Sequence, residues 1–207
     1  MPTKLFFELN ESKQRKIINV GITEFATYGY TNSSTNRIVK SSGISKGSLF
    51  KYFSCKEELY FFILDLVTTE LVENLEKKTT DLSTELFQRI IEYSILEFTW
   101  YIQNPEKAKL IIGAFTKSNV DIYGKTIERY NIKEFDIYYG LLENVDLSNF
   151  RWDKQKTINI LKWFLKGFNE DFLENAQCNI HSFEDIRNEY LRNLTEYMEI
   201  VKIGIIK

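Results

Sequence analysis

Basic and hydroxyl side chains gather in residues 30–56, a segment that contains no acidic residue. Its cations are Arg37, Lys40, Lys46, Lys51 and Lys56. Lys and Arg bind phosphate oxygens, and hydroxyl groups donate hydrogen bonds to phosphates and to base edges. A charge run alone more often forms a solvated surface, so a polyanion-binding role depends on the elements that present these groups.

Helix-start and helix-stop signals in the same segment predict two short helices joined by a tight turn. Gly29 ends an amphipathic helix, and Ser33 is a good N-cap for a short helix that ends at Gly43. Ser45 then caps a second short helix over residues 46–52. Two short helices joined by a turn that contains glycine form a helix-turn-helix, whose second helix lies in a groove of DNA.

The expected DNA contacts follow from this arrangement. Leu49 and Phe53 point toward the core, so the other face of the second helix is left to the groove, and Gly47 lets the backbone come close. A capping box from Ser54 to Glu57 starts the next, longer helix. The candidates are Ser33, Ser34, Arg37, Ser45, Lys46, Gly47, Ser48, Phe50, Lys51, Tyr52 and Lys56.

At these positions the chain resembles the TetR family of ligand-responsive bacterial transcription regulators. The family's motif is matched over about the first 60 residues by Phe25-Ala26, Gly29-Tyr30, Ser33-Ser34, Ile38-Val39, Gly43-Ile44-Ser45-Lys46-Gly47, Leu49-Phe50, Tyr52-Phe53 and Lys56-Glu57. Phe50 stands where the family commonly has tyrosine, which removes a phosphate-binding hydroxyl, whereas Tyr52, in place of a frequent histidine, can still donate. The resemblance implies an all-α fold of about nine helices, with an N-terminal three-helix helix-turn-helix unit and a larger helical domain.

Charge and length agree with two units of different character. The chain has 207 residues and a formal net charge of -2, yet residues 1–60 hold nine Lys and Arg against five Asp and Glu. The basic surplus is therefore confined to one end. The rest is typical of helix throughout, without β-type alternation or repeats. We expect a helix-turn-helix DNA-binding domain over residues 1–58 and a helical ligand-binding and dimerisation domain over residues 59–207.

Enzyme, metal and membrane classes find no support in the sequence. It contains no P-loop, HExxH motif or dinucleotide fingerprint, and its single histidine, His181, lies in a predicted loop. Cys55 and Cys178 have no CxxC partner and no His/Cys cluster nearby, so neither a disulfide framework nor a zinc site is expected. No apolar run approaches the roughly 18 residues of a membrane span. We expect a cytoplasmic protein with no catalytic residues, no cofactor and no metal.

Aromatic residues make up 15% of the chain, and many lie in the predicted second domain. Family members enclose a small-molecule pocket among the corresponding helices, although an aromatic stripe at helical spacing is more often core than pocket. Glu92 and Glu97 lie in an otherwise apolar helix, where a buried carboxylate is costly unless it is paired. They either select a cationic lipophilic ligand or simply reach the surface or a lysine. The pocket candidates are Phe62, Glu92, Glu97, Trp100, Phe115, Tyr123, Tyr130, Tyr138 and Trp163.

The last two predicted helices are long, and their short connection makes them antiparallel neighbours with broad apolar faces. The resemblance implies that they pair with the same helices of a second copy, and a twofold dimer also suits two half-sites on DNA. The alternative is that both helices only close the core of one chain. The interface candidates are Leu161, Leu165, Phe168, Phe172, Tyr190, Leu194 and Tyr197.

Together these expectations describe a ligand-responsive transcriptional repressor that binds a near-palindromic double-stranded DNA operator as a homodimer. A small hydrophobic or aromatic effector would release it by shifting the helix that begins near Cys55, which both domains share. The alternative is an effector-free helical DNA-binding protein of architectural type, which would need only the first 60 residues.

Overall fold

The structure is a computed structural model of the whole chain, and it describes all residues except 118–121, 131–144, 147, 177–181 and 207. Its elements are α1 (Lys4–Phe7), α2 (Glu11–Asn32), α3 (Thr35–Ser42), α4 (Lys46–Tyr52), α5 (Lys56–Glu76), the 3-10 helix η1 (Thr79–Asp81), α6 (Leu86–Gln103), α7 (Pro105–Ala114), α9 (Lys154–Ala176) and α10 (Phe183–Ile205). Residues 122–130 are also helical. Within the described residues the only β-type pairing is an isolated bridge between Phe150 and Ile206. The predicted all-α class is confirmed.

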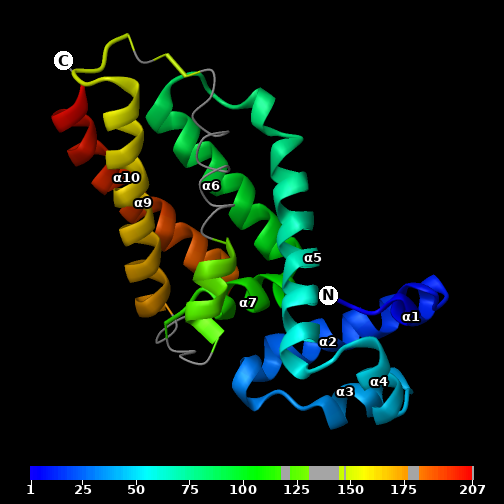
Figure 1. Cartoon of the computed structure of the whole chain (residues 1–207). Coiled ribbons are helices and arrows are strands. Elements are labelled where there is room, and N and C mark those ends of the chain that lie inside the picture. Colours follow the sequence, from blue (N-terminus) through cyan, green and yellow to red (C-terminus); the bar gives the residue numbers. More distant parts are fainter. Residues whose placement is uncertain (118–121, 131–144, 147, 177–181, 207) are drawn as a thin grey trace.

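Helices α1 to α4 form an N-terminal unit at one end of the molecule, beside the start of α5 (Figure 1). Its centre is a small apolar cluster in which each side chain is at most 1% exposed, made of Phe6, Ile17, Ile38, Leu49 and Phe53. Every helix of the unit contributes to this cluster, and the Phe6 ring meets the Phe53 ring at a centroid distance of 5.0 Å. These residues are the N-terminal part of one continuous apolar core, and they fix α4 from behind.

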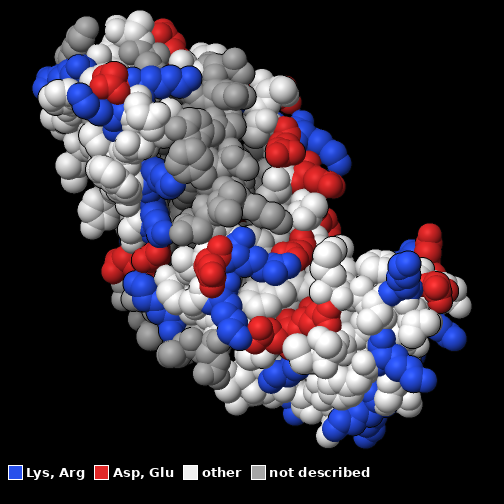
Figure 2. Space-filling model, in the orientation of Figure 1, with Lys and Arg blue, Asp and Glu red and all other residues white. Residues whose placement is uncertain are grey.

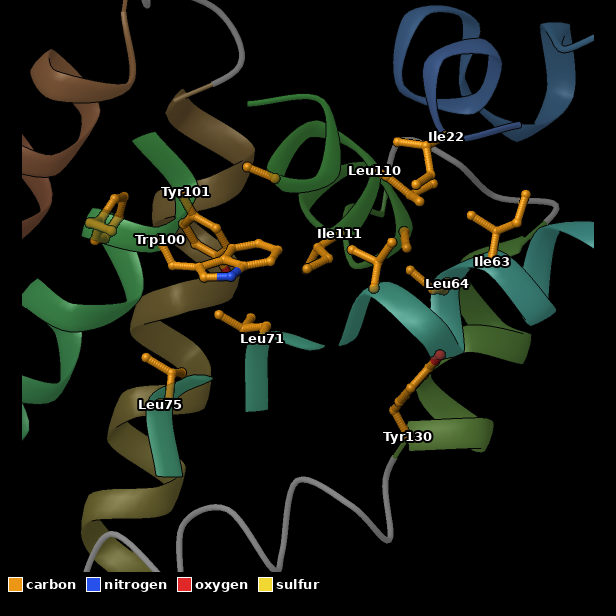
Figure 3. Close-up of a cluster of buried hydrophobic side chains, with 14 of the residues drawn as sticks. Ile22, Ile63, Leu64, Leu71, Leu75, Trp100, Tyr101, Leu110, Ile111 and Tyr130 are labelled. Atoms are coloured by element: carbon orange, nitrogen blue, oxygen red, sulfur yellow. The ribbon is translucent and has the colours of Figure 1, made fainter. Parts of the chain in front are cut away.

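The larger unit consists of α6, α7, α9, α10 and most of α5 (Figure 1). Helix α6 packs extensively against α10 and also contacts α5 and α7, so it is the central helix, as its apolar sequence predicts. Figure 3 shows how side chains from α5, α6 and α7 meet, with Leu71, Trp100 and Ile111 converging in the core. None of the helices among the described residues is long and apolar enough to cross a membrane.

Helix α5 belongs to both units. Near its start, the buried Tyr60 ring lies 5.0 Å from Phe25 and 5.1 Å from Tyr30 of α2, measured between centroids. Farther along, α5 contacts α6 and α7. A second junction is formed where α2 packs directly on α7, and there the Thr23 hydroxyl donates to the Glu106 carboxylate at 2.9 Å. The N-terminal unit is thus joined to the larger one by two helix contacts.

Local capping signals place most helix ends as predicted. Gly29 breaks α2 with a left-handed φ of 65°, and Gly43 ends α3 with a φ of 72°, a region that costs little only for a residue without a Cβ. The Ser45 hydroxyl caps α4 by accepting from the amide of Ser48 at 3.0 Å. At α10 the Ser182 hydroxyl accepts from the amide of Asp185.

Two predicted caps are wrong in detail. The N-cap of α3 is Ser34 and not Ser33, and no serine hydroxyl caps that helix. The N-cap of α5 is Cys55, and the expected box from Ser54 to Glu57 is absent. Instead the carboxylate of Glu58, one position further on, accepts from both the amide and the hydroxyl of Ser54. Because α5 begins at Lys56, one residue later than predicted, the carboxylate that caps its start is that of Glu58 and not that of Glu57.

Candidate DNA interface and effector-binding region

The second helix of the helix-turn-helix, α4, presents one polar face to solvent. Leu49 is buried, whereas Lys46, Phe50 and Lys51 are exposed. A Cβ added at Gly47 would meet no atom nearer than 3.9 Å, so this position lies open on the surface. The exposed face therefore combines two ammonium groups with a stretch of accessible backbone, which suits close approach to a DNA groove.

Two serine hydroxyls share the first turn of α4. The oxygens of Ser45 and Ser48 are 2.8 Å apart, and Ser45 also accepts from the amide of Ser48. Ser48 is half-buried, and Ser45 is exposed. Because a hydroxyl both donates and accepts, this pair retains hydrogen-bonding capacity that can be directed to a base edge.

The positive charges gather over α3 and α4. Figure 2 shows Lys and Arg side chains concentrated on the lower end of the molecule, where Figure 1 places these two helices. Lys40, Lys46 and Lys51 are all exposed. In the described part of the chain, none of these three ammonium groups is assigned an ion-pair partner. This surface is the one suited to phosphates.

The structure corrects the role expected for Ser33. Its side chain is 7% exposed, and its hydroxyl donates to the carbonyl of Tyr30 at 2.6 Å. The hydroxyl therefore stabilises the turn before α3 instead of facing DNA. Its neighbour Ser34 is half-buried, and the Ser34 amide donates to the carboxylate of Glu24 at 2.7 Å.

Two of the five predicted cations are engaged inside the unit. The Arg37 guanidinium forms several hydrogen bonds with Glu24, the shortest 2.6 Å, and lies 4.0 Å from the centre of the Tyr28 ring. The Lys56 ammonium donates to the carbonyl of Tyr30 at 2.8 Å and lies over the ring of the same residue. Sequence reasoning missed Glu24, whose signal was an acidic residue between two apolar residues that are buried, Ile22 and Phe25.

Comparison with known proteins supports the arrangement. Residues 17–61 match the model of the family described as bacterial regulatory proteins, tetR family. This chain is a TetR-family transcriptional regulator. Like the rest of that family, it is a DNA-binding protein and not an enzyme.

Individual relatives extend the similarity beyond the N-terminal unit. The chain is 25% identical to the HTH-type transcriptional regulator QacR of Staphylococcus aureus over 93% of this chain and 97% of QacR. It is also 25% identical to the nucleoid occlusion factor SlmA of Haemophilus ducreyi, over 50% of this chain and 51% of SlmA. The crystal structure of FadR from Bacillus subtilis in complex with stearoyl-CoA has the same fold, with a TM-score of 0.66, 16% identity, and coverage of 87% of this chain and 96% of that one.

The structure of the TetR-family regulator divides the predicted pocket residues. Trp100 is buried in the core beside α5 and α7, and Tyr130 is buried with its hydroxyl donating to Asp65 at 2.6 Å. The ring of Phe115 lies 5.5 Å from that of Tyr130. Tyr123 is half-buried in the same helical stretch, residues 122–130. Tyr138 lies outside the described residues.

Three of the predicted pocket residues, Phe62, Trp163 and Glu92, lie in other parts of the structure. Phe62 contacts the rings of Phe6, Phe7 and Phe53, so it belongs to the core of the N-terminal unit. Trp163 is 69% exposed and faces outward from α9. Both misplacements have one cause: the helical period shows that a residue is apolar and repeats, but not which neighbour its face meets.

The two acidic residues of α6, Glu92 and Glu97, have different environments. The Glu92 carboxylate accepts from the amide of Ser83 at 2.7 Å and from the side chain of Gln88 at 2.9 Å. It therefore closes the loop before α6. Glu97 is different, since its carboxylate accepts from the buried Tyr101 hydroxyl at 2.7 Å. Burial raises the pKa of the Glu97 carboxyl, and the hydrogen bond from Tyr101 opposes this rise.

Two hollows lie on α2, one beside α3 and one beside α7, and no predicted pocket residue lines either of them. An open groove of about 710 Å³ runs between α2 and α3 in the N-terminal unit, along Val20, Tyr28, Arg37 and Lys40. A smaller hollow of about 310 Å³ lies where α2 meets α7. The aromatic interior of the larger unit is packed as core in its described part.

Most predicted interface residues are corrected in a similar way. Five of them are buried within the single chain: Leu161, Leu165, Phe172, Tyr190 and Leu194. Phe168 is half-buried among the rings of Phe172 and Tyr190. Only Tyr197 is largely exposed, at 51%. The stripe chosen from the sequence is therefore the inward face of α9 and α10.

The two glutamates of α6 should respond oppositely to replacement by glutamine. Because the pKa of Glu97 is raised, the stability that protonated Glu97 provides is complete below about pH 4.3, the ordinary glutamate value, and is lost as pH rises through its folded pKa. Glu97→Gln cannot ionise, so its free energy of unfolding relative to wild type should rise from pH 4 to pH 7 in urea titrations.

Glu92→Gln is the matched control on the same helix. Hydrogen bonds from the Ser83 amide and from Gln88 lower the pKa of Glu92, so its ionised form contributes stability above the ordinary glutamate pKa and loses it in acid. This variant should therefore become less stable relative to wild type as pH rises over the same range. A shared sign for the two variants would contradict the assigned environments.

Proposed function

We propose that this TetR-family regulator is a dimeric repressor that binds a near-palindromic operator through α3 and α4 of its two copies. A small hydrophobic or aromatic effector, held in the larger unit, releases it. The observation that carries this proposal is the exposed face of α4, where Lys46, Gly47 and Lys51 lie open while Leu49 is buried behind them. Such a protein acts in the cytoplasm, where its operator lies.

Each side chain of the exposed face has a proposed role. Lys46 and Lys51 neutralise phosphates, and the Ser48 hydroxyl reads a base edge at the point where Gly47 lets the backbone approach. The phenol of Tyr52 donates to a phosphate. We place the boundary of the DNA-binding domain near residue 58, because the first turns of α5 complete the core around α4 while the rest of α5 packs on α6 and α7.

The outward faces of α9 and α10 support dimerisation. Both helices expose large apolar side chains opposite their buried stripes: Ile160, Trp163, Tyr197, Ile200 and Ile203. Exposed apolar patches of this kind mark interaction sites. The Tyr197 ring reaches the Phe168 ring at 6.0 Å, which links the exposed strip of α10 to α9. A second copy that packs by the same strips would cover them through a twofold interface.

The contacts of α5 support its proposed role in release. Three acidic residues along the helix pair with cations of the larger unit. Glu57 pairs with Lys125, and Asp65 pairs with Arg129. Glu70 pairs with Lys107 of α7. An effector that shifts residues 122–130 or α7 therefore acts on α5 along its length, including its first turn beside the DNA-binding unit.

The chemistry of the larger unit favours an apolar effector. Its interior is aromatic and aliphatic, and burial within it raises the pKa of the Glu97 carboxyl. A protonated Glu97 is compatible with an apolar ligand, and its ionised form would favour a cationic one. FadR, which shares the fold, was crystallised with stearoyl-CoA, so long-chain acyl compounds belong in a first screen.

The second candidate is an effector-free DNA-binding protein of architectural type. It is favoured by aromatic side chains of the larger unit that are buried against one another, such as Phe98, Trp100 and Tyr101. Similarity over half the chain to a relative named as a nucleoid occlusion factor points the same way. Ligand screening decides between the two candidates.

Operator reading can be tested on α4. DNA selected from a random-sequence library by the wild-type protein should contain two related half-sites about one helical turn apart. Ser48→Ala should relax the preference at one position per half-site, a loss of about 1–3 kcal/mol of discrimination there. Lys51→Ala should weaken binding to every sequence alike. A Ser48→Ala profile identical to wild type would remove Ser48 from base recognition.

Release can be tested with a ligand found by thermal-shift screening of lipophilic and acyl compounds. It should weaken operator binding by roughly 5- to 150-fold, and operator should weaken ligand binding by the same factor, because linkage is reciprocal. Lys125→Gln removes the ion pair with Glu57 and should reduce this factor while the ligand still binds. Lys109→Gln, at an exposed position of α7, is the control. A broad library that yields no ligand would favour the architectural candidate.

Dimerisation can be tested on the two faces of α10. Ile200 is 66% exposed in the single chain, so Ile200→Glu should leave the fold intact and raise the dimer dissociation constant roughly 100-fold, since the change occurs twice in a twofold interface. Leu194→Glu, on the buried face, should unfold the chain. Leu66→Glu, on an exposed part of α5, should change neither property. Wild-type protein that sediments as a monomer at micromolar concentration would contradict the proposal.

A further inference from the structure

We infer that Arg37, Lys56 and Glu24 are positioning residues: they hold the turn before α3 and thereby orient the recognition helix, and neither cation is a phosphate ligand. The turn consists of residues 30–33, which follow the break at Gly29, and is called the α2–α3 turn below. This assignment goes beyond the proposed function, since it separates the basic side chains that touch DNA from those that shape the unit. The assignment rests on the proposed function only because its test uses operator DNA as a probe.

The backbone carbonyls of the α2–α3 turn are all held by these two cations. The Lys56 ammonium donates to the carbonyl oxygen of Tyr30 at 2.8 Å, and to those of Thr31 and Ser33 at 3.3 Å each. The Arg37 guanidinium donates to the remaining one, Asn32, at 2.8 Å. Backbone carbonyl oxygens at the C-terminal end of a helix carry partial negative charge. Two cationic side chains therefore stabilise the four consecutive carbonyls of this turn.

Glu24 commits Arg37 to this arrangement. The Glu24 side chain is 7% exposed, and its carboxylate accepts from Nε of Arg37 at 2.9 Å and from the Ser34 amide at 2.7 Å. A buried carboxylate without a partner is strongly unfavourable. If Arg37 turned toward a phosphate, Glu24 would lose its cationic partner and the Asn32 carbonyl would lose the guanidinium donor.

Lys56 is committed in the same sense. It is half-buried at the first turn of α5, and its ammonium lies 4.5 Å from the centre of the Tyr30 ring. A contact with phosphate would break three hydrogen bonds to carbonyls. Lys51, by contrast, is exposed on α4, and no ion pair or side-chain hydrogen bond is assigned to its ammonium in the described part of the chain.

The two anchors act on opposite sides of one short segment. Arg37 and Glu24 tie the turn to α2 and to the first residue before α3, whereas Lys56 ties it to α5. Since α3 begins at Thr35 and packs on α4, the direction in which the turn leaves α2 sets the direction of both helices. Loss of either set of hydrogen bonds should therefore weaken sequence-specific binding more than non-specific binding to DNA.

The test compares two DNA probes and matched variants of the full chain. One probe is a duplex selected by the wild-type protein from random-sequence DNA, and the other is a scrambled version of it. Dissociation constants are measured over a range of KCl concentrations. Lys56→Met and Lys51→Met remove the same charge at two positions, and Glu24→Gln removes the carboxylate charge while leaving Arg37 in place. Thermal unfolding shows that each variant is folded at the assay temperature.

For a positioning role, Lys56→Met should bind the selected duplex about tenfold more weakly, because the turn must then be ordered during binding. Its affinity for the scrambled duplex and its salt dependence should stay at the wild-type values. Lys51→Met should lose affinity for both probes, and its slope of log affinity against log salt should fall by about 0.9.

Glu24→Gln gives a second and independent outcome. Positioning predicts weaker binding to the selected duplex although the unit has become more positive, whereas a phosphate role for Arg37 predicts equal or tighter binding to both probes. A fall in salt slope for Lys56→Met, or tighter binding by Glu24→Gln, would overturn the proposal. If the wild type selects no sequence at all, the proposed operator function fails, and the slopes on the scrambled duplex alone still decide the role of Lys56.

Discussion

The hydrogen bonds between the ammonium of Lys56 and the backbone at the end of α2 tie together the parts of this molecule that have to move as one. Lys56 is the first residue of α5, and the carbonyls that it holds belong to the turn that leads into α3. The start of α5 therefore cannot shift without disturbing the entry into the helix-turn-helix. Glu57, the next residue, pairs with Lys125 of the larger unit. Thus Lys56 contacts the N-terminal unit, and Glu57, the next residue, contacts the larger unit.

This arrangement gives α5 a different character at each end. Its first turns are fixed by polar contacts and by the Tyr60 ring against Phe25, whereas its later turns combine apolar packing around Leu71 and Leu75 with the ion pairs of Asp65 and Glu70. Apolar contacts tolerate small sliding better than directional hydrogen bonds do. A shift of α5 would therefore have its largest effect at the first turn, where Lys56 holds the backbone that leads into α3.

The sequence predicted what depends on neighbouring residues. Gly29, Gly43 and the Ser45 cap follow from backbone preferences over one turn of helix, and α4 has the predicted bounds. The partners of the basic residues could not be predicted in this way. Glu24 lies 13 positions from Arg37, and Lys56 lies 26 positions from Tyr30, so only the folded unit brings them together.

The predicted interface residues of α9 and α10 were wrong for a related reason. Both carry apolar side chains on two faces, and helical periodicity does not show which face meets the rest of the chain. Leu194 points inward because α6 lies against α10, and a single sequence does not contain this information. The strip with Trp163 and Ile200 is equally periodic, and the sequence analysis assigned Trp163 to the pocket. Along α5 the same ambiguity placed Phe62 in the wrong unit, since one continuous stripe serves two cores.

The positions of the tryptophans have a consequence for how the protein can be observed. All three tryptophans lie in the larger unit, Trp100 in its core and Trp152 and Trp163 on its surface. The unit that carries α3 and α4 contains none. Indole fluorescence of the unlabelled protein is therefore silent about the recognition helix itself. Any change in emission when DNA is added reports a rearrangement beyond the junctions at α5 and at α2 with α7, so the native chain contains its own optical reporter of communication between its units.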